Sequence, residues 1–384
     1  MDFRLTPEQE LLKAAVAGIA AGYGHEYFQA KTREGAKPDE LWAELGRGGF
    51  LGVHLPEAYG GGGMGISELT IVCEEVAAAG CPLLLILVSP AICATLLATF
   101  GTDAQKRQWL PAMARGEAKM AFAITEPDAG SNSYRISTTA RKDGDVWRLN
   151  GSKYYISGVD EAEAVIVVAR TGTEEGTGKA KLSLFVADTD AKGFEARQIP
   201  VEIAAPEKQF TVFFDDCVLD SDRLLGTEGD GLHQVFAGLN PERLMAAAVS
   251  CGIGRYALDV AAAYARERRV WDRPIGAHQG VAHPLAKAKI ELELARLMLA
   301  KAAWCYDAGT EAGEAANMAK YAAAEAALGA LDQAIQTHGG NGLASSYGLA
   351  DLWGTARLLR TAPVSREMIL NFVAQHSLGL PKSY

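Results

Sequence analysis

The stretch AFAITEPDAGSNS, residues 121–133, lies where the character of the chain changes. Before it, residues 1 to about 119 predict helices, and TPEQ at residues 6–9 has the capping-box pattern with proline at the first helical position. After it, VWRLNGSKYYISG and KQFTVFFDDCVL are rich in β-branched and aromatic residues and are bounded by turns, which is typical of strands. The stretch therefore joins a helical domain to a β-domain.

Long segments rich in alanine and leucine return after residue 225 and predict helices near 230–270, 281–308, 313–338, 345–360 and 364–376. Breaks at WDRPIGAHQG and THGGNG separate them. We expect a mostly α protein with a central β-domain: an N-terminal helical domain over 1–119, a small barrel-like β-domain over 120–225 and a C-terminal four-helix bundle over 226–384.

The composition is that of a compact globular protein, with 384 residues, 49% of them hydrophobic, and a net charge of −10. An acidic balance argues against nucleic acid as the main partner. The six cysteines form no CxxC and no zinc-site spacing, so we expect buried free thiols, no metal and a reducing, cytoplasmic location. The N-terminus does not resemble a signal peptide, and the apolar run at 81–100 carries two prolines, so no membrane span is expected.

Two glycine-containing segments have alternative interpretations. YGGGGMG, residues 59–65, formally contains GxGxxG, but it lacks a preceding strand and a βαβ unit, so we interpret it as a loop between helices. Within residues 121–133 the small residues and the hydroxyls of Thr125, Ser131 and Ser133 suit either a ligand site or an ordinary Asp/Gly/Ser turn.

The segment ITEPDAGSN resembles the signature of the acyl-CoA dehydrogenase family, the flavoproteins that desaturate acyl-CoA thioesters. The resemblance extends over essentially the whole chain, because PEAYGGGGMG, NGSKYYISG, ARERRVWDRPIGAHQ and QTHGGNGL follow in the family's order and spacing. It implies a helical, then β, then four-helix fold, FAD as cofactor, an acyl-CoA substrate of fatty acid β-oxidation and an electron-transferring flavoprotein as electron acceptor.

The resemblance assigns a first set of flavin contacts to the β-domain. Phe122, Ile124 and Thr125 are expected against the isoalloxazine, Ser131 at the cofactor phosphate, Tyr155 in place of the usual tryptophan, and Ser157 in place of the threonine beside N5. Tyr155 and Ser157 are equally consistent with alternate positions on one face of a strand.

A second set of contacts is expected to reach the FAD of a neighbouring subunit: Arg268, Trp271, Gln279, Gln336, Gly339 and Gly340. If FAD is bound across subunits, a monomer lacks a complete site, so a homodimer or homotetramer follows. The alternative is that the basic residues complete a helix C-terminus and the glycines end a helix.

The usual base of the family is a glutamate near the C-terminus, and an ungapped count from GGNG places Pro363 at that position. Proline has neither a carboxylate nor a backbone N–H. A minority of the family carries the base on a C-terminal-domain helix just before an arginine, which here is Glu242 followed by Arg243 in LNPERLMAAAV, residues 239–249. The alternative is a helix start with Asn240 as N-cap, although the helical pattern before it favours a kink at Pro241.

We therefore predict an FAD-dependent acyl-CoA dehydrogenase with Glu242 as base and Arg243 fixing its orientation or charge. The second hypothesis, motivated by Pro363, is a catalytically silent FAD- or acyl-CoA-binding subunit of a hetero-oligomeric acyl-CoA dehydrogenase. A related flavin hydroxylase is a third.

Overall fold

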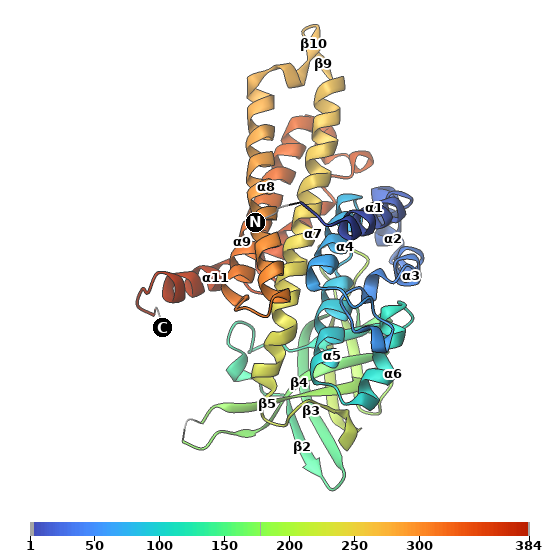
Figure 1. Cartoon of the computed structure of the whole chain (residues 1–384), viewed down its shortest axis with the longest axis vertical. Helices are drawn as coiled ribbons and strands as arrows, with labels where there is room; N and C mark the ends of the chain where they lie inside the picture. Colours follow the sequence, from blue (N-terminus) through green and yellow to red (C-terminus); the bar gives the residue numbers. More distant parts are fainter. Residues whose placement is uncertain (1–3, 177, 383–384) are drawn as a thin grey trace.

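The computed structural model describes residues 4–176 and 178–382. Helices make up the N-terminal part, shown in blue and cyan in Figure 1. They are α1 (Pro7–Ala21), α2 (Gly24–Glu34), α3 (Asp39–Arg47), α4 (Ile66–Ala78), the π-helix η3 (Leu87–Ala94), α5 (Thr95–Phe100) and α6 (Asp103–Ala114). The capping box that the sequence predicts at Thr6 is present, and a second one occurs at Thr102; each hydroxyl accepts from the backbone N–H three residues on.

A single twisted sheet follows, with strand order β6-β7-β3-β2-β4-β5-β8 and β1 paired in parallel to β4. The strands are β1 (Met120–Ala123), β2 (Thr139–Asp143), β3 (Val146–Ser157), β4 (Ala164–Thr173), β5 (Ala180–Asp188), β6 (Phe194–Ile199), β7 (Gln209–Asp220) and β8 (Leu224–Leu225). Residues Ala164–Ala169 of β4 are all buried, because this strand is covered on both faces.

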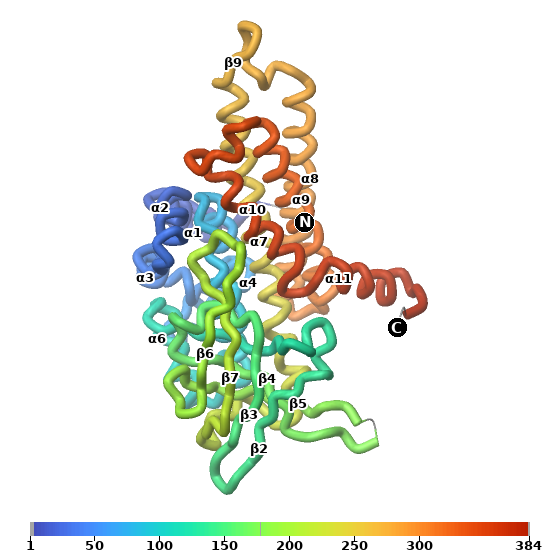
Figure 2. Tube along the Cα trace, turned by 180° about the vertical axis from the view of Figure 1, so that it is seen from behind, coloured from blue at the N-terminus to red at the C-terminus, as the bar shows by residue number. Residues whose placement is uncertain are grey.

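The C-terminal part is built on three long helices, α7 (Gly231–Glu267), α8 (Gln279–Asp307) and α9 (Gly313–His338). A short hairpin of β9 (Arg269–Val270) and β10 (Arg273–Pro274) joins α7 to α8 at the end farthest from the sheet (Figure 1). Then come α10 (Leu352–Thr361), α11 (Arg366–Phe372) and a π-turn (Val373–Ser377), and α11 and the segment after it project from the body (Figure 2). The helix–sheet–helix order that the sequence predicts is confirmed.

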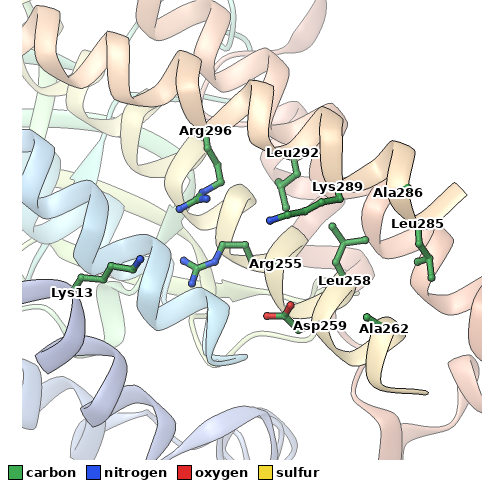
Figure 3. A pocket seen from close by; sticks show the side chains of 10 residues that line it. All are labelled: Lys13, Arg255, Leu258, Asp259, Ala262, Leu285, Ala286, Lys289, Leu292 and Arg296. Atoms are coloured by element: carbon green, nitrogen blue, oxygen red, sulfur yellow. The ribbon is translucent and has the colours of Figure 1, made fainter. Parts of the chain in front are cut away.

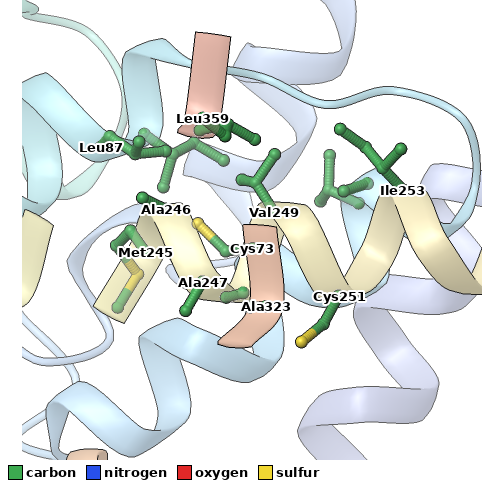
Figure 4. Close-up of a cluster of buried hydrophobic side chains, with 14 of the residues drawn as sticks. Cys73, Leu87, Met245, Ala246, Ala247, Val249, Cys251, Ile253, Ala323 and Leu359 are labelled. Carbon is green, nitrogen blue, oxygen red and sulfur yellow. The ribbon is translucent and has the colours of Figure 1, made fainter. Parts of the chain in front are cut away.

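Helix α7 is the central element of the molecule. Every residue from Leu244 to Gly254 is buried, and Figure 4 shows this apolar run packed against Cys73 of α4, Leu87 of η3, Ala323 of α9 and Leu359 of α10. By length and composition α7 could cross a membrane, but 78% of its most apolar window is buried inside the protein, as in the core helix of a globular domain.

Helix α7 also decides between the two interpretations of residues 239–249. It runs unbroken from Gly231 to Glu267 with Pro241 inside it, so a new helix start with Asn240 as N-cap is wrong. A proline at this position cannot donate to the carbonyl of Ala237, four residues earlier. The hydroxyl of Tyr306 on α8 donates to that carbonyl instead, at 3.1 Å, which explains why the helix tolerates the proline.

Candidate active site

The segment that follows β1 is fixed by a buried ion pair. The Nζ atom of Lys153 on β3 lies 2.9 Å from a carboxylate oxygen of Glu126, and the two side chains are 0% and 3% exposed. The same ammonium donates to the carbonyl of Ile124 at 3.1 Å, while Glu126 also accepts from the backbone N–H groups of Ser137 and Thr138. Ile124 and Thr125 are thereby held against β3.

The ionisation of this pair follows from its surroundings. Burial by itself raises the pKa of Glu126, but the charge of Lys153 and the hydrogen bonds from residues 137 and 138 outweigh it and lower that pKa to about 2. Burial lowers the pKa of Lys153 to about 8. Sequence patterns did not single out this pair, although Glu126 lies in ITEPDAGSN and Lys153 in NGSKYYISG, two of the motifs on which the family resemblance rests.

A β-bulge presents Tyr155. The pairing of β3 with β7 shifts register between Lys153 and Ile156, and Tyr155 has a φ of 57°. A bulge re-aims the side chain of the extra residue. The ring of Tyr155 is 54% exposed, with the ring of Tyr154 at a centroid distance of 4.3 Å. The simple strand alternation considered for Tyr155 is therefore broken at this residue, and an aromatic face is offered to a ligand.

The neighbouring predicted positions lie close to this bulge. Phe122 is buried on β1, and the carbonyl of Thr125 accepts from the backbone N–H of Tyr154 at 2.8 Å. The hydroxyl of Ser157 donates to Oε1 of Gln209 on β7 at 3.0 Å, and Ser131 is exposed in the turn after β1. This part of the structure offers an exposed aromatic ring, hydroxyls and backbone groups, which suit the isoalloxazine ring and a phosphate of a flavin cofactor.

The second predicted set lies elsewhere, at the end of the helical bundle away from the sheet (Figure 1). Its members occur at the ends of α7, α8 and α9 and are exposed: Arg268, Trp271, Gln279, Gln336, Gly339 and Gly340. Trp271 is 83% exposed. A side chain added at Gly340 would meet nothing within 4 Å, so packing inside the chain does not require this glycine. One chain does not bring the two sets together.

Glu242 lies on α7 with its carboxylate toward the interior, although the residue as a whole keeps partial exposure. Burial raises its pKa to about 8, against the opposing effects of Arg243 and of Lys320 on α9. On the other side, the charge of Glu242 acts on the thiol of Cys93 in η3, and that thiol donates to the carbonyl of Ala121 at 3.3 Å. Glu242 is therefore close enough to the Cys93 thiol for its charge to act on it, and that thiol is hydrogen-bonded to β1.

Arg243 is held close to α7 itself. Its Nη1 donates to Oδ1 of Asn240 at 2.6 Å, and its guanidinium lies 5.9 Å from the ring centroid of Phe236. Its Nε is buried and has no hydrogen-bond partner among the described residues. Burial lowers the pKa of Arg243, and the charge of Glu242 opposes that effect. An unpaired buried N–H beside a carboxyl is a ready donor for a ligand.

Pro363 lies in the turn between α10 and α11, and the only acid close behind it in sequence, Glu367, is exposed in the first turn of α11.

A cavity of about 550 Å³ elsewhere, between α1, α7 and α8, is lined by several cations (Figure 3). Two of these, Arg255 and Arg296, share the carboxylate of Glu74 at 2.8 and 2.7 Å. This second region is an ion-pair network that ties helices together.

Three family descriptions match consecutive parts of the chain: acyl-CoA dehydrogenase N-terminal domain over residues 6–117, middle domain over 121–217 and C-terminal domain over 229–378. The chain belongs to the acyl-CoA dehydrogenase family. It is therefore an FAD-dependent oxidoreductase that acts on acyl-CoA thioesters.

Individual relatives agree with this placement. The chain is 58% identical over 379 residues to acyl-CoA dehydrogenase FadE12 of Mycobacterium tuberculosis, covering 98% of this chain and 97% of the relative. It resembles the structure of a glutaryl-CoA dehydrogenase–glutaryl-CoA complex with a TM-score of 0.94 and 32% identity, covering 100% and 98% of the two chains. A glutaryl-CoA dehydrogenase from Mycobacterium smegmatis in complex with FADH2 matches with a TM-score of 0.92 and 25% identity, covering 99% and 96%.

Proposed function

We propose that this protein desaturates an acyl-CoA thioester between Cα and Cβ, with Glu242 removing the α-proton while a hydride leaves the β-carbon for flavin N5. The observation that carries the proposal is the position of Glu242: an interior carboxyl on α7, directly before the buried run from Leu244 to Gly254, with Arg243 beside it and a charge that acts on the Cys93 thiol. The family relationship supports the reaction class, and the buried acid supports the residue.

The chemistry needs a base of raised pKa, because the α-proton of a thioester is weakly acidic. Glu242 meets this need, since burial raises its pKa to about 8. An acyl chain that displaces water from the site strengthens each remaining charge interaction. Arg243 beside it stabilises the carboxylate and keeps an unpaired Nε for the ligand.

FAD, when bound, supplies the hydride acceptor. We assign its isoalloxazine, and with Ser131 its phosphate, to the β-domain residues described above, and its remaining contacts to the far end of a second subunit's bundle. The β-domain residues are Phe122, Ile124, Thr125, Ser131, Tyr155 and Ser157. The bulge that exposes Tyr155 and the ion pair that holds Ile124 both favour this assignment.

The turn at Pro363 supports a role for Glu242, because that turn carries no acid at the position where the family usually has one. The same observation favours a second candidate, a catalytically silent subunit that binds FAD or acyl-CoA within a hetero-oligomer. Proline removes two functions there, the carboxylate and the backbone N–H that would polarise the thioester carbonyl.

The test is anaerobic mixing of the purified holoenzyme with a panel of acyl-CoAs while the flavin absorbance is followed. Wild type should bleach with at least one thioester, and Glu242→Gln should bleach at least about 10²-fold more slowly. The matched control is Glu367→Gln, an exposed acid near the usual base position, which should bleach like wild type. Equal rates for wild type and Glu242→Gln would show that another group is the base. Failure of every thioester, together with co-purification of a related chain, would favour the silent subunit.

The assembly we propose is a homodimer or homotetramer. Four large apolar side chains lie along one side of α8, at 51–64% exposure: Ile290, Leu294, Leu297 and Trp304. Such a stripe suits helix packing between subunits, and the separate location of the second proposed flavin set supports an assembly in which a neighbouring chain completes the site. Light scattering of the holoenzyme measures the mass of the assembly directly.

We further propose electron-transferring flavoprotein as the electron acceptor and fatty acid β-oxidation as the pathway. We propose the cytoplasm as the location, because the free cysteines favour a reducing compartment.

A further inference from the structure

Lys320 lies in the N-terminal third of α9 with its side chain in the interior, where the residue is 1% exposed. Its Nζ donates to the backbone carbonyl of Val364 at 2.6 Å and to that of Arg360 at 3.3 Å. These carbonyls belong to the end of α10 and to the turn that contains Pro363. The ammonium therefore links the turn at the usual base position to the N-terminal third of α9.

Hydrogen bonds to two carbonyl oxygens do not by themselves offset the cost of burying the Lys320 ammonium. A buried ammonium is unfavourable unless negative charge opposes it. Among the described residues, no carboxylate oxygen lies within the 4.0 Å ion-pair distance of the Lys320 Nζ. Burial and the charge of Arg243 lower the pKa of Lys320 to about 8, and three acids oppose that effect from farther away: Glu242, Glu325 and Glu367. Glu325 already pairs with Arg360 at 2.7 Å, and Glu367 is exposed, so Glu242 is the interior acid that remains.

We propose that Lys320 is a positioning residue for Glu242: held by the turn at Pro363, its ammonium supplies the positive charge that favours the carboxylate form of Glu242 once an acyl group has excluded water from the site. This inference rests on the proposed function of Glu242. It also gives the turn at Pro363 a role, although this turn carries no acid. The turn holds the ammonium of Lys320, and that ammonium supports Glu242 on α7.

The charged and titratable groups that act on Glu242 come from three elements. Arg243 is its neighbour on α7, and Cys93 lies on η3. Lys320 lies on α9 one turn before Ala323, which packs against the apolar run of α7 that begins directly after Glu242 and Arg243 (Figure 4). Burial raises the pKa of Cys93 well above its usual range, so the thiol is neutral near pH 7. Removing the charge of Lys320 therefore leaves Arg243 as the only neighbouring cation among these groups, and the carboxylate becomes harder to form.

The test separates the charge of Lys320 from its structural role, which is to hydrogen-bond the carbonyls of Arg360 and Val364. Lys320→Gln keeps a neutral hydrogen-bond donor, and Lys320→Met removes both charge and donor. In both holoenzymes the pH midpoint of anaerobic flavin reduction by an acyl-CoA should shift upward by about one pH unit. The infrared carboxyl band of Glu242, identified by its loss in Glu242→Gln, should shift its titration in the same direction without turnover. The Met variant should lose more thermal stability than the Gln variant.

Two further variants serve as controls. Lys320→Arg keeps the charge and should keep the wild-type midpoint, and Lys301→Gln removes an exposed charge from α8 and should change nothing. Unchanged pH midpoints of flavin reduction in Lys320→Gln and Lys320→Met, with stability reduced, would overturn the inference. Lys320 would then have a structural role only. Loss of the proposed function has a different signature, namely a Glu242→Gln variant that reduces its flavin as fast as wild type.

Discussion

Replacing Glu242 with Gln should stabilise the protein, and the gain should grow with pH. The pKa of Glu242 is raised from 4.5 to about 8 in the folded protein. Between these values the unfolded chain releases a proton that the folded protein keeps, so wild-type stability falls as pH rises through this window. Each pH unit corresponds to about 1.4 kcal/mol, which bounds the effect at about 5 kcal/mol. Partial solvent exposure of the residue reduces the expected gain to about 2 kcal/mol at pH 8.

The assay is thermal or urea unfolding of wild type and Glu242→Gln, each as holoenzyme, at several pH values from 5 to about 8.5. The difference in free energy of unfolding should be small near pH 5 and should increase steadily toward pH 8, since glutamine does not titrate. Glu367→Gln, on the exposed side of α11, is the matched control. A stability difference that stays constant over this range, or that grows toward acid pH, would refute the reasoning that the interior holds Glu242 protonated.

Two predictions concern the framework of the site. Lys153→Met leaves the carboxylate of Glu126 buried without its cation, so it should lower the free energy of unfolding by about 3–5 kcal/mol and weaken FAD retention, measured by chemical unfolding and bound-flavin content. A smaller loss in the Glu126→Gln, Lys153→Met double variant would support coupling of the pair, and additive losses would contradict it. Gly252→Ala places a methyl group 2.5 Å from the Cβ of Ala77, where α7 crosses α4, and should cost about 1–3 kcal/mol. Gly329→Ala on α9 meets nothing within 4 Å and should be neutral or stabilising, and equal effects of the two alanines would contradict the packing argument.

Much of the architecture can be predicted from local pattern. Capping boxes at Thr6 and Thr102 mark two helix starts, and the change from helical to strand periodicity near residue 120 marks the sheet. Such features depend on neighbours within a few residues, which is why they can be recognised in a single sequence.

Other features depend on contacts between distant parts of the chain. The continuity of α7 through Pro241 is accompanied by a hydrogen bond from the hydroxyl of Tyr306, which satisfies a carbonyl 69 residues away. The Lys153–Glu126 pair joins residues 27 apart, and the left-handed backbone of Tyr155 occurs at a residue type that does not favour it. Lys320 reads in sequence as an ordinary helix residue, and only the fold places its ammonium on the turn at Pro363. Most of these residues belong to the candidate site, so the site is harder to predict from the sequence than the fold.

The most direct measurement of the central claim is removal of the α-proton itself. An acyl-CoA that bleaches the wild-type flavin is deuterated at Cα and incubated anaerobically with the holoenzyme in ordinary water, and loss of deuterium is followed by mass spectrometry. Wild type should wash out the label, while Glu242→Gln, with its flavin bound and its fold intact, should do so about 10²–10⁴-fold more slowly. Washout at the wild-type rate in Glu242→Gln would contradict the account, because a group other than the α7 carboxylate would then be taking the proton.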